Sequence, residues 1–469
     1  MSHYDAIVVG SGPNGLAAAI TLAQAGRKTL LIEARDTVGG GMRTKELTLP
    51  GFKHDVCSAI HPNGEKSEFF SQLPLADYGL EWIHPEATIA HPLESDAALS
   101  YRSLEETAKG LGIDEGAYRF LFAPSVRAWD KLSEDVLRPL IKIPKHLIPL
   151  AQFGWRALLP ATVLGNAFFE TEEAKALFGG IAAHSVLPLG KIGTSAAGML
   201  LGSLGHVAGW PLPKGGSQSL ADALAAHFES LGGEIQTDWQ VKTLAELPEA
   251  DTVMLDVGVK QFLNMTDDLP KPYRAWLTRF RHGPGVFKVD YALSEPVPWK
   301  DPAVLKAATV HIGGTLSEMA ESERGLMQGK VNEKPFVLAA QQSLFDDSRA
   351  PAGKHTLWAY CHVPNGSEGD MSTAIENQIE RFAPGFRDVV LARHTMNAPT
   401  YANYNPNYVG GDINGGAATL WQFAVRPVPS PNPYKTPLKG VYLCSASTPP
   451  GGGIHGMCGY NAARRALRD

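Results

Sequence analysis

Cysteine, surplus positive charge and uninterrupted apolar runs are all scarce in this chain of 469 residues. The four cysteines form no CxxC pair and share no metal-ligand spacing with histidine, so the sequence predicts neither a disulfide scaffold nor a metal site and favours a reducing compartment. The 42 basic side chains against 48 acidic ones leave a formal charge of −6, which argues against a nucleic-acid partner. With 44% hydrophobic and 19% charged residues, the composition is that of a folded globular protein.

Targeting and membrane-spanning segments are not evident either. A strand pattern begins by about residue 5, which leaves no room for a signal peptide, so we expect a cytoplasmic protein. Residues 192–213 carry no Asp, Glu, Lys or Arg, but their five glycines and two prolines do not suit a spanning helix. We expect a buried helix and a turn there instead.

Glycine, in contrast, is abundant, with 48 residues in the chain. Residues 10–15 read GSGPNG, a GxGxxG motif that follows an apolar run at residues 6–9. An alanine-rich stretch at residues 14–25 predicts a helix, and a second apolar run at residues 28–33 completes a βαβ unit. A glycine motif in this context predicts a dinucleotide site.

Each residue type in this motif has a physical role. Gly10 allows the tight turn, Gly12 lets the backbone approach a pyrophosphate, and Gly15 lets helix and strand pack closely. The helix N-terminus offers free amides and a partial positive charge to the phosphates. Glu33, 18 residues after Gly15, can accept hydrogen bonds from a ribose diol and would repel a 2′-phosphate.

A second glycine cluster lies near the C-terminus, with five glycines between Gly451 and Gly459. The pattern predicts a strand at residues 438–445, a glycine-rich loop, and a helix at residues 456–467. Such a loop and the free amides at the start of the helix are what a second contact with the cofactor needs, and the positive helix potential would there stabilise an anionic group.

These strings resemble a known family. An acidic residue followed six positions later by the pair Gly39-Gly40 is typical of flavoproteins of the glutathione-reductase type. The C-terminal string closely resembles the phytoene desaturase-related FAD oxidoreductases of the amine oxidase superfamily, a group that includes the pyridine nucleotide-disulfide oxidoreductase-domain proteins. Matching strings occur at residues 51–62, 209–216, 283–290 and 310–314, so the resemblance spans nearly the whole chain, with residues 100–180 contributing least.

The sequence departs from the family pattern at two places. Many members have Arg directly after the glycine pair, where this chain has Gly41 and its nearest arginine is Arg43. The usual acidic residue of the last strand–loop is absent, and Ala446 and Ser447 stand in that neighbourhood. The ribityl contact would then depend on backbone and hydroxyl groups.

The resemblance implies an α/β fold with a Rossmann-like FAD-binding domain, interleaved with an α+β substrate domain that has a helical cap. We predict the FAD domain at residues 1–76, 205–280 and 426–469, and the substrate domain at residues 77–204 and 281–425. Val241 fits the position where such proteins clamp the adenine edge through the backbone, with an ordinary strand valine as the alternative. Together, motif and resemblance imply FAD contacts from Gly10, Ser11, Gly12, Pro13, Asn14, Gly15, Glu33, Ala34, Arg35, Gly40, Gly41, Met42, Arg43, Ser58, Val241, Ala446, Ser447, Gly453, Ile454, His455, Gly456 and Met457.

The resemblance also implies the reaction class. No second GxGxxG lies between a strand and a helix, so electrons must come from an organic substrate and leave to oxygen, a quinone or a carrier. We expect desaturation of a C–C bond in a hydrophobic compound such as a carotenoid, an isoprenoid or an acyl compound. A redox-neutral double-bond isomerase and an amine oxidase are alternatives, and so is a prenyl-binding protein of the GDP-dissociation-inhibitor type, although that class needs no intact nucleotide motif.

Two features remain open on sequence alone. His455 and His61 lie in family-like strings and are the candidates for proton transfer, with a structural role as the alternative. Residues 136–169 contain four Lys or Arg, no acid, and many apolar residues. They fit either a lid that contacts a membrane surface or a helical cap whose basic face is solvated or lies at a subunit contact. The sequence does not predict the oligomeric state, and a dimer is among the states that it allows.

Overall fold

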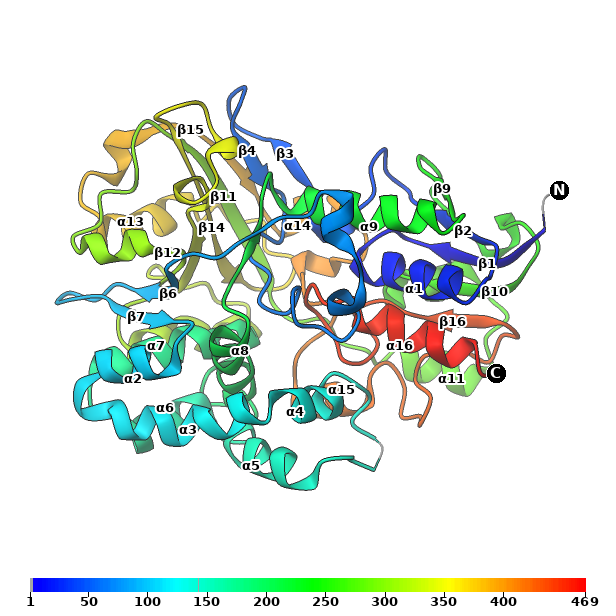
Figure 1. Cartoon of the computed structure of the whole chain (residues 1–469), viewed down its shortest axis with the longest axis horizontal. Coiled ribbons are helices and arrows are strands. Elements are labelled where there is room, and N and C mark those ends of the chain that lie inside the picture. The colour runs from blue at the N-terminus through cyan, green and yellow to red at the C-terminus, as the bar shows by residue number, and fades with distance from the viewer. Residues whose placement is uncertain (1–2, 142) are drawn as a thin grey trace.

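Two β-sheets organise the chain in the computed structural model, which describes residues 3–141 and 143–469 (Figure 1). The first has five parallel strands in the order β16-β10-β1-β2-β9. The second has seven strands in the order β15-β11-β14-β13-β12-β6-β7, antiparallel except where β6 meets β12. Two small antiparallel pairs, β3-β4 and β5-β8, lie beside them.

The five-stranded sheet is assembled from three separate parts of the chain. Its strands are β1 (Tyr4–Val9), β2 (Thr29–Ile32), β9 (Glu234–Gln236), β10 (Ala250–Leu255) and β16 (Val441–Leu443). One face is covered by α1 (Pro13–Gln24), α9 (Ser217–Ser230) and α16 (Met457–Ala466), and the other by α10 (Val259–Met265) and α11 (Lys271–Leu277). Because β1 and β2 are buried on both faces, they read as continuous apolar runs.

The seven-stranded sheet draws on two other parts of the chain. Its strands are β6 (Ala87–His91), β7 (Ala98–Tyr101), β11 (Gly285–Leu293), β12 (Ala307–Ile312), β13 (Val337–Ala340), β14 (His355–Val363) and β15 (Val390–Met396). Helix α13 (Ser372–Phe382) packs on one face. The opposite face contacts a helical layer comprising α2 (Leu104–Gly110), α3 (Glu115–Arg127), α4 (Trp129–Val136), α5 (Leu147–Ala157), α6 (Ala161–Phe168), α7 (Glu172–Ala182), α8 (Ser195–Val207) and α12 (Leu316–Arg324).

Strand β11 shows how different the two faces of this sheet are. Phe287, Val289 and Tyr291 point toward α13 and belong to an apolar cluster. The alternating residues Lys288 and Asp290 point the other way and are fully buried. The face toward the helical layer therefore carries buried charge.

The remaining elements connect the two sheets. They are β3 (Thr44–Glu46), β4 (Lys53–Asp55), β5 (Trp82–Ile83), β8 (Leu212–Pro213), α14 (Ala398–Tyr404) and α15 (Leu420–Val425). The strands of each sheet fall within the segments predicted for one domain, whereas the domain boundaries themselves stay a prediction. Residues 192–213, expected to form a buried helix and a turn, contain α8.

Membrane-spanning length was assessed over residues 3–141 and 143–469. No single helix there is both long and apolar enough to cross a membrane. Helices α5 and α6 reach the required length and composition only as a pair, and the pair is bent by 95°.

Candidate functional site

A pocket of about 670 Å³ opens where β1, β2 and β10 end. Ligands of open α/β sheets bind at this carboxyl edge. The predicted cofactor residues on its wall are Gly10, Ser11, Gly12, Pro13, Asn14, Glu33, Ala34, Arg35, Gly40, Gly41, Arg43, Val241, Ala446, Ser447, Gly453 and Ile454. Gly15, Met42, Ser58, His455, Gly456 and Met457 do not line it.

The glycine motif is packed too closely for side chains. An added Cβ at Gly15 would overlap the carbonyl oxygen of Gly10, and one at Gly12 would lie 2.8 Å from Asp256 Oδ2. Gly40 has φ +56°, and a Cβ there would lie 2.8 Å from the Cα of Gly12. The N-terminal loop and the glycine pair therefore touch through their backbones, which leaves peptide groups facing the pocket.

Glu33 follows β2 and is held by three neighbours. Its Oε2 accepts hydrogen bonds from the Ser11 hydroxyl at 2.5 Å and the Ser11 amide at 3.0 Å. Its Oε1 lies 3.1 Å from Arg43 Nη2 and accepts from the Arg35 amide at 3.0 Å. The buried carboxylate is thereby fixed at the pocket wall, where the motif predicts the ribose contact.

Arg43 makes contacts at the pocket that could not be predicted from its position in the sequence. Its guanidinium donates to the carbonyl oxygens of Thr37 and Gly40 and lies over the ring of Tyr404, 5.8 Å from the centroid. The ion pair with Glu33 and the contact with Tyr404 outweigh burial and raise the pKa of Arg43. Arg43 stays charged beside the pocket.

Tyr408 explains the departure at Gly41. An ideal Cβ on Gly41 would lie 2.5 Å from the Tyr408 hydroxyl oxygen, so no side chain fits there unless the tyrosine moves. Tyr404 and Tyr408 both line the pocket, although they belong to the segment predicted for the substrate domain. The sequence pattern alone carried no signal for this contact.

Asp256 is a second pocket residue that the motifs missed. It directly follows β10, and its Oδ2 accepts the Gly15 amide at 2.9 Å. Burial raises its pKa well above the ordinary value, as does the charge of Glu33, while hydrogen bonds from the Gly15 and Gly12 amides act in the opposite direction. A signal was available in the sequence, because the acidic residue Asp256 directly follows strand β10 at the edge where the pocket lies.

The C-terminal loop reaches the pocket from the far end of the chain. Ala446 and Ser447 line it, and Ser447 Oγ lies 2.7 Å from Ser445 Oγ. Arg426, which is buried, supports the loop by donating to the carbonyl oxygens of Ala446 and Gly416. Backbone and hydroxyl groups thus stand where the family pattern has an acid.

His455 caps the last helix. Its Nδ1 accepts the Met457 amide at 3.0 Å, and burial lowers its pKa to about 4. The first amide of α16 is therefore already bonded to this imidazole. The catalytic role stays a prediction.

His61, the other candidate for proton transfer, is also buried. Its Nε2 is 2.9 Å from Ser217 Oγ, its Nδ1 has no hydrogen-bond partner in the described structure, and burial lowers its pKa to about 4. Ser58, between the pocket and this histidine, donates its hydroxyl to the Gly41 carbonyl at 2.8 Å. Its own carbonyl accepts from Ser217 Oγ.

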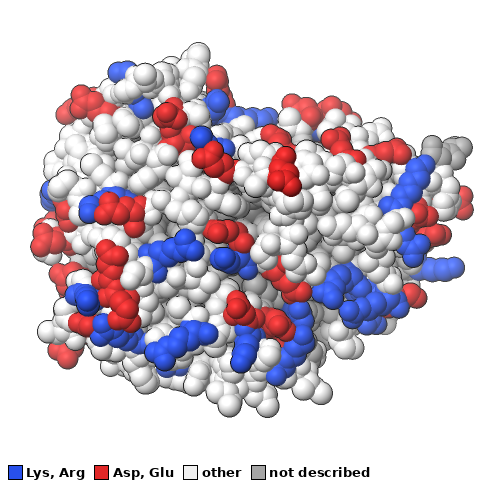
Figure 2. Space-filling view, viewed as in Figure 1, with Lys and Arg blue, Asp and Glu red and all other residues white. Residues whose placement is uncertain are grey.

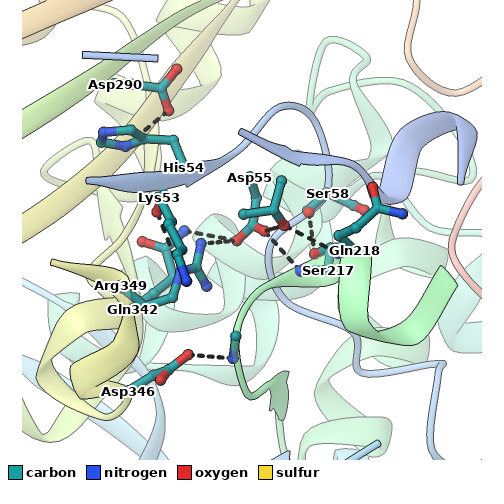
Figure 3. Close-up of polar contacts among 12 residues, drawn as sticks. Lys53, His54, Asp55, Ser58, Ser217, Gln218, Asp290, Gln342, Asp346 and Arg349 are labelled. Carbon is teal, nitrogen blue, oxygen red and sulfur yellow. Dashed lines mark hydrogen bonds and ion pairs between the residues drawn. The ribbon is translucent and has the colours of Figure 1, made fainter. Parts of the chain in front are cut away.

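A buried polar network behind the pocket joins the two sheets (Figure 3). Asp55, at the end of β4, accepts from Arg349, from the Ser217 amide at 2.8 Å and from Thr44 Oγ1 at 2.7 Å. Asp346 accepts the Gly215 amide at 2.7 Å. The network anchors the chain segment that runs on from the Gly40–Arg43 turn to the seven-stranded sheet.

A second charged cluster lies on the inner face of that sheet. The Lys288 ammonium bonds both oxygens of Asp290, which also lies 3.7 Å from His54 Nδ1 and 3.6 Å from His394 Nδ1. Burial lowers the pKa of Lys288 despite the attraction of Asp290. The sequence showed Lys288 within a family-like string but gave no role for it.

The pocket suits a dinucleotide cofactor of the FAD type. Its glycine turns bring the backbone to the pocket wall, Glu33 offers carboxylate oxygens, and the buried Asn14 Oδ1 has no partner in the described structure. Metal binding has no comparable support, because no group of three or more His, Cys, Asp or Glu within the described residues could hold an ion.

Comparison with known proteins supports this reading of the site. A family model described as "NAD(P)-binding Rossmann-like domain" matches residues 8–73. Pyridine nucleotide-disulfide oxidoreductase domain-containing protein 2 of Rattus norvegicus is 26% identical, with 100% of this chain and 94% of the relative covered. One component of the limonene dehydrogenase of Castellaniella defragrans is 22% identical (100% and 95% covered), and the lycopene-forming phytoene desaturase of Paracoccus sp. is 23% identical (97% and 95%).

Solved structures show the same fold. An oxidoreductase from Methanosarcina mazei superposes with a TM-score of 0.66 at 14% identity, and putrescine oxidase with a TM-score of 0.63 at 18% identity; both cover 100% of each chain. The fold is thus that of the amine oxidases, while the named sequence relatives are oxidoreductases and desaturases. The comparisons thus support an FAD-dependent oxidoreductase that is similar in sequence to the phytoene desaturases and in fold to the amine oxidases.

Proposed function

We propose that the chain binds FAD in the 670 Å³ pocket and desaturates a C–C bond of a hydrophobic organic substrate. One observation carries the proposal: Gly12 of the N-terminal motif and Gly453 of the C-terminal loop line the same pocket. Each loop alone is a common structural element, but together they form two ends of an extended cofactor site.

The chemistry follows from that placement. FAD, when bound, supplies N5 as a hydride acceptor, which requires positioning and a dry site more than a strong base. Glu33 would orient the ribose, and the N-terminal end of α1 would attract the phosphate oxygens. Tyr408 and the C-terminal loop would exclude water from the opposite end.

A hydrophobic substrate is supported by the names of two relatives. Phytoene and limonene, which appear in the names of two relatives, are both apolar hydrocarbons. A carotenoid, isoprenoid or acyl compound is therefore the proposed class, with oxygen, a quinone or a carrier as electron acceptor.

Two other enzymatic outcomes share the same site. A redox-neutral double-bond isomerase would use the pocket without net electron transfer. An amine oxidase is favoured by one feature, because Tyr404 and Tyr408 place two aromatic side chains on the pocket wall. A prenyl-binding protein without a flavin would leave Glu33 and the glycine cradle without a function.

The spectrum of the purified protein tests the cofactor, and an anaerobic screen tests the reaction. Flavin bands that persist through desalting would support FAD binding, whereas colourless protein that takes up no FAD would overturn it. Anaerobic incubation with carotenoids, fatty acyl compounds and amines should bleach the flavin with an apolar substrate. Bleaching by amines alone would favour the amine oxidase, and product formation without bleaching would favour the isomerase.

A further inference from the structure

Arg426, which directly follows α15, is a buried cation with which no carboxylate of residues 3–141 and 143–469 forms an ion pair. On the surface, in contrast, lysine and arginine side chains lie among acidic ones (Figure 2). Arg426 is only 2% exposed. Its guanidinium donates to the carbonyl oxygens of Ala446 at 3.2 Å and Gly416 at 3.3 Å, and its Nε has no hydrogen-bond partner in the described structure. Because carbonyl oxygens carry no net charge, these bonds leave the positive charge uncompensated.

The groups around Arg426 do not neutralise it. Asp412 attracts the guanidinium, but its two oxygens accept the amides of Gly283 and Asn414, at 2.8 and 2.9 Å. The thiol of Cys458 also faces the guanidinium, and burial raises the pKa of this thiol to about 12, so it stays neutral. Burial lowers the pKa of Arg426, yet a guanidinium remains protonated inside proteins. A further negative charge near this site would therefore be stabilised.

The guanidinium of Arg426 lies directly behind the wall of the cofactor pocket. Ala446, whose carbonyl oxygen it bonds, lines the pocket, and so does Gly415, the chain neighbour of Gly416. A Cβ added to Gly451 would overlap the guanidinium, so the backbone of the glycine-rich loop packs on the cation. Arg426 thus supports two segments of the pocket wall and places a positive charge behind them.

The C-terminal loop, behind which Arg426 lies, faces the half of the pocket that the proposed function leaves for the flavin. The N-terminal motif and Glu33 would take the adenosine and phosphate half of FAD. The first amide of α16 is already bonded to His455, so this helix end has less positive potential to offer the flavin. A reduced flavin carries a negative charge on its pyrimidine part. In a site that excludes water, a fixed positive charge acts on such a group over several ångströms.

We infer that Arg426 is a positioning residue whose charge, acting through the C-terminal loop, favours negative charge on the flavin of bound FAD. The inference rests on the proposed FAD site. A hydride that N5 accepts brings an electron pair with it and leaves one negative charge on the flavin. Stabilising that charge makes the bound flavin a stronger oxidant, which suits a substrate whose C–H bonds are poor hydride donors.

Sulfite titration of the FAD-loaded protein tests the inference without a substrate. The lone pair on the sulfur of sulfite forms a bond with N5 of oxidised flavin, and the ring gains a negative charge as it does on reduction. The adduct bleaches the visible flavin band, so absorbance gives its dissociation constant. We expect the wild type to bind sulfite at least about tenfold more tightly than free FAD does, because the fixed charge stabilises the adduct.

Two substitutions separate the charge of Arg426 from its hydrogen bonds. Arg426→Gln keeps an N–H donor but no charge, and it should weaken sulfite binding at least about tenfold, which is about 30 mV for a two-electron couple. Arg426→Lys keeps the charge and should bind sulfite within about threefold of the wild type. Arg27→Met is the control, because it removes an exposed cation from the same sheet and should bind sulfite like the wild type. Circular dichroism and the absorbance of desalted protein show that each variant is folded and holds FAD.

Equal sulfite affinity in the wild type and Arg426→Gln would overturn the inference and leave FAD binding intact. Affinity as weak in Arg426→Lys as in Arg426→Gln would also overturn it, because the hydrogen bonds and not the charge would then be responsible. If Arg426→Gln retains no FAD, the other two proteins decide: tight sulfite binding in both the wild type and Arg426→Lys supports the inference, and wild-type affinity no higher than that of free FAD overturns it. A wild type that takes up no FAD would overturn the proposed function together with this inference.

Discussion

Asp55 and Arg349 form an ion pair at 2.8 Å in which neither side chain is exposed. Asp55 ends β4 of the small β3-β4 pair, and Arg349 lies between β13 and β14 of the seven-stranded sheet. Burial opposes ionisation of Asp55, but Arg349 and the hydrogen bonds from Ser217 and Thr44 outweigh it and lower the pKa. The ion pair ties the β3-β4 pair to the seven-stranded sheet.

We expect Arg349→Met to lower the free energy of unfolding by about 3–5 kcal/mol, because it leaves a buried carboxylate unpaired. The double variant Asp55→Asn/Arg349→Met should recover part of that loss, since neither charge remains. Urea denaturation measures both. Glu86→Gln is the control, because its pair with Lys306 is exposed and should matter by less than about 1 kcal/mol. A loss in Arg349→Met no larger than in this control would contradict the role of the pair.

The ion pair between Asp55 and Arg349 also makes the stability of the protein depend on pH. In the folded protein the pKa of Asp55 lies below its ordinary value of 3.8. The stability that the ionised carboxylate contributes is therefore fully present above about pH 3.8 and is lost as the pH falls through the lower, folded-state pKa. The stability difference between wild type and Asp55→Asn should therefore shrink in acid. A difference that stays constant down to the lowest pH at which the protein folds would contradict this assignment.

Gly12→Leu should abolish retention of FAD. Its Cβ would meet Asp256 Oδ2 at 2.8 Å, so the new side chain must displace the loop that faces the pocket. Absorbance of the desalted protein measures retention. Gly116→Ala is the control, since nothing lies within 4 Å of a Cβ there. Yellow Gly12→Leu protein with a full complement of FAD would show that the cofactor lies elsewhere.

The local parts of this site were predictable from sequence, and the long-range contacts were not. The GSGPNG motif specifies a strand, a turn and a helix within a few residues, because only glycine fits its close approaches. Tyr408 against Gly41, in contrast, joins positions 367 residues apart, and no periodicity encodes such a meeting. The pairing of Arg43 with Glu33 was hidden for a related reason: spacing places both near the turn but does not tell which partner the guanidinium takes.

The seven-stranded sheet illustrates the same limit. Because side chains alternate along a strand, Lys288 and Asp290 share a face of β11. Whether that face is solvated or buried depends on the helical layer, most of which comes from residues 104–207. The family resemblance is weakest at residues 100–180. Burial of this charged pair therefore became apparent only with the tertiary structure.

Asp256→Asn should change how stability depends on pH. Since burial raises the pKa of Asp256, the folded protein keeps a proton that the unfolded chain loses above about pH 4. The contribution of Asp256 to the stability of the wild type thus falls as the pH rises toward the folded-state pKa, by up to about 1.4 kcal/mol per pH unit. Asparagine can still accept the Gly15 amide and does not titrate, so the variant should gain stability relative to wild type as the pH rises.

Thermal melts from pH 4 to pH 7 measure this difference. Asp96→Asn is the control, because Asp96 is exposed. Parallel curves for wild type and Asp256→Asn would mean that Asp256 ionises in the folded protein as easily as in the unfolded chain. The pocket would then hold two negative charges, Asp256 and Glu33, near the predicted phosphate site.

His455 can be assigned by comparing two substitutions. His455→Ala removes the acceptor of the Met457 amide and should lower the free energy of unfolding by about 0.5–2 kcal/mol, as loss of a helix cap does. His455→Asn offers an oxygen to the same amide and should recover most of that loss.

Both variants should also change how stability depends on pH. The pKa of His455 is lowered to about 4, so the stability that the neutral imidazole contributes is fully present above about pH 6.5 and is lost as the pH falls toward 4. Urea denaturation across that range measures this, and a pH profile of kcat/KM for the same proteins tests proton transfer. If His455→Asn is stable and retains FAD but loses turnover, His455 transfers a proton; if it also keeps turnover and its pH profile, the imidazole serves only as the cap of α16.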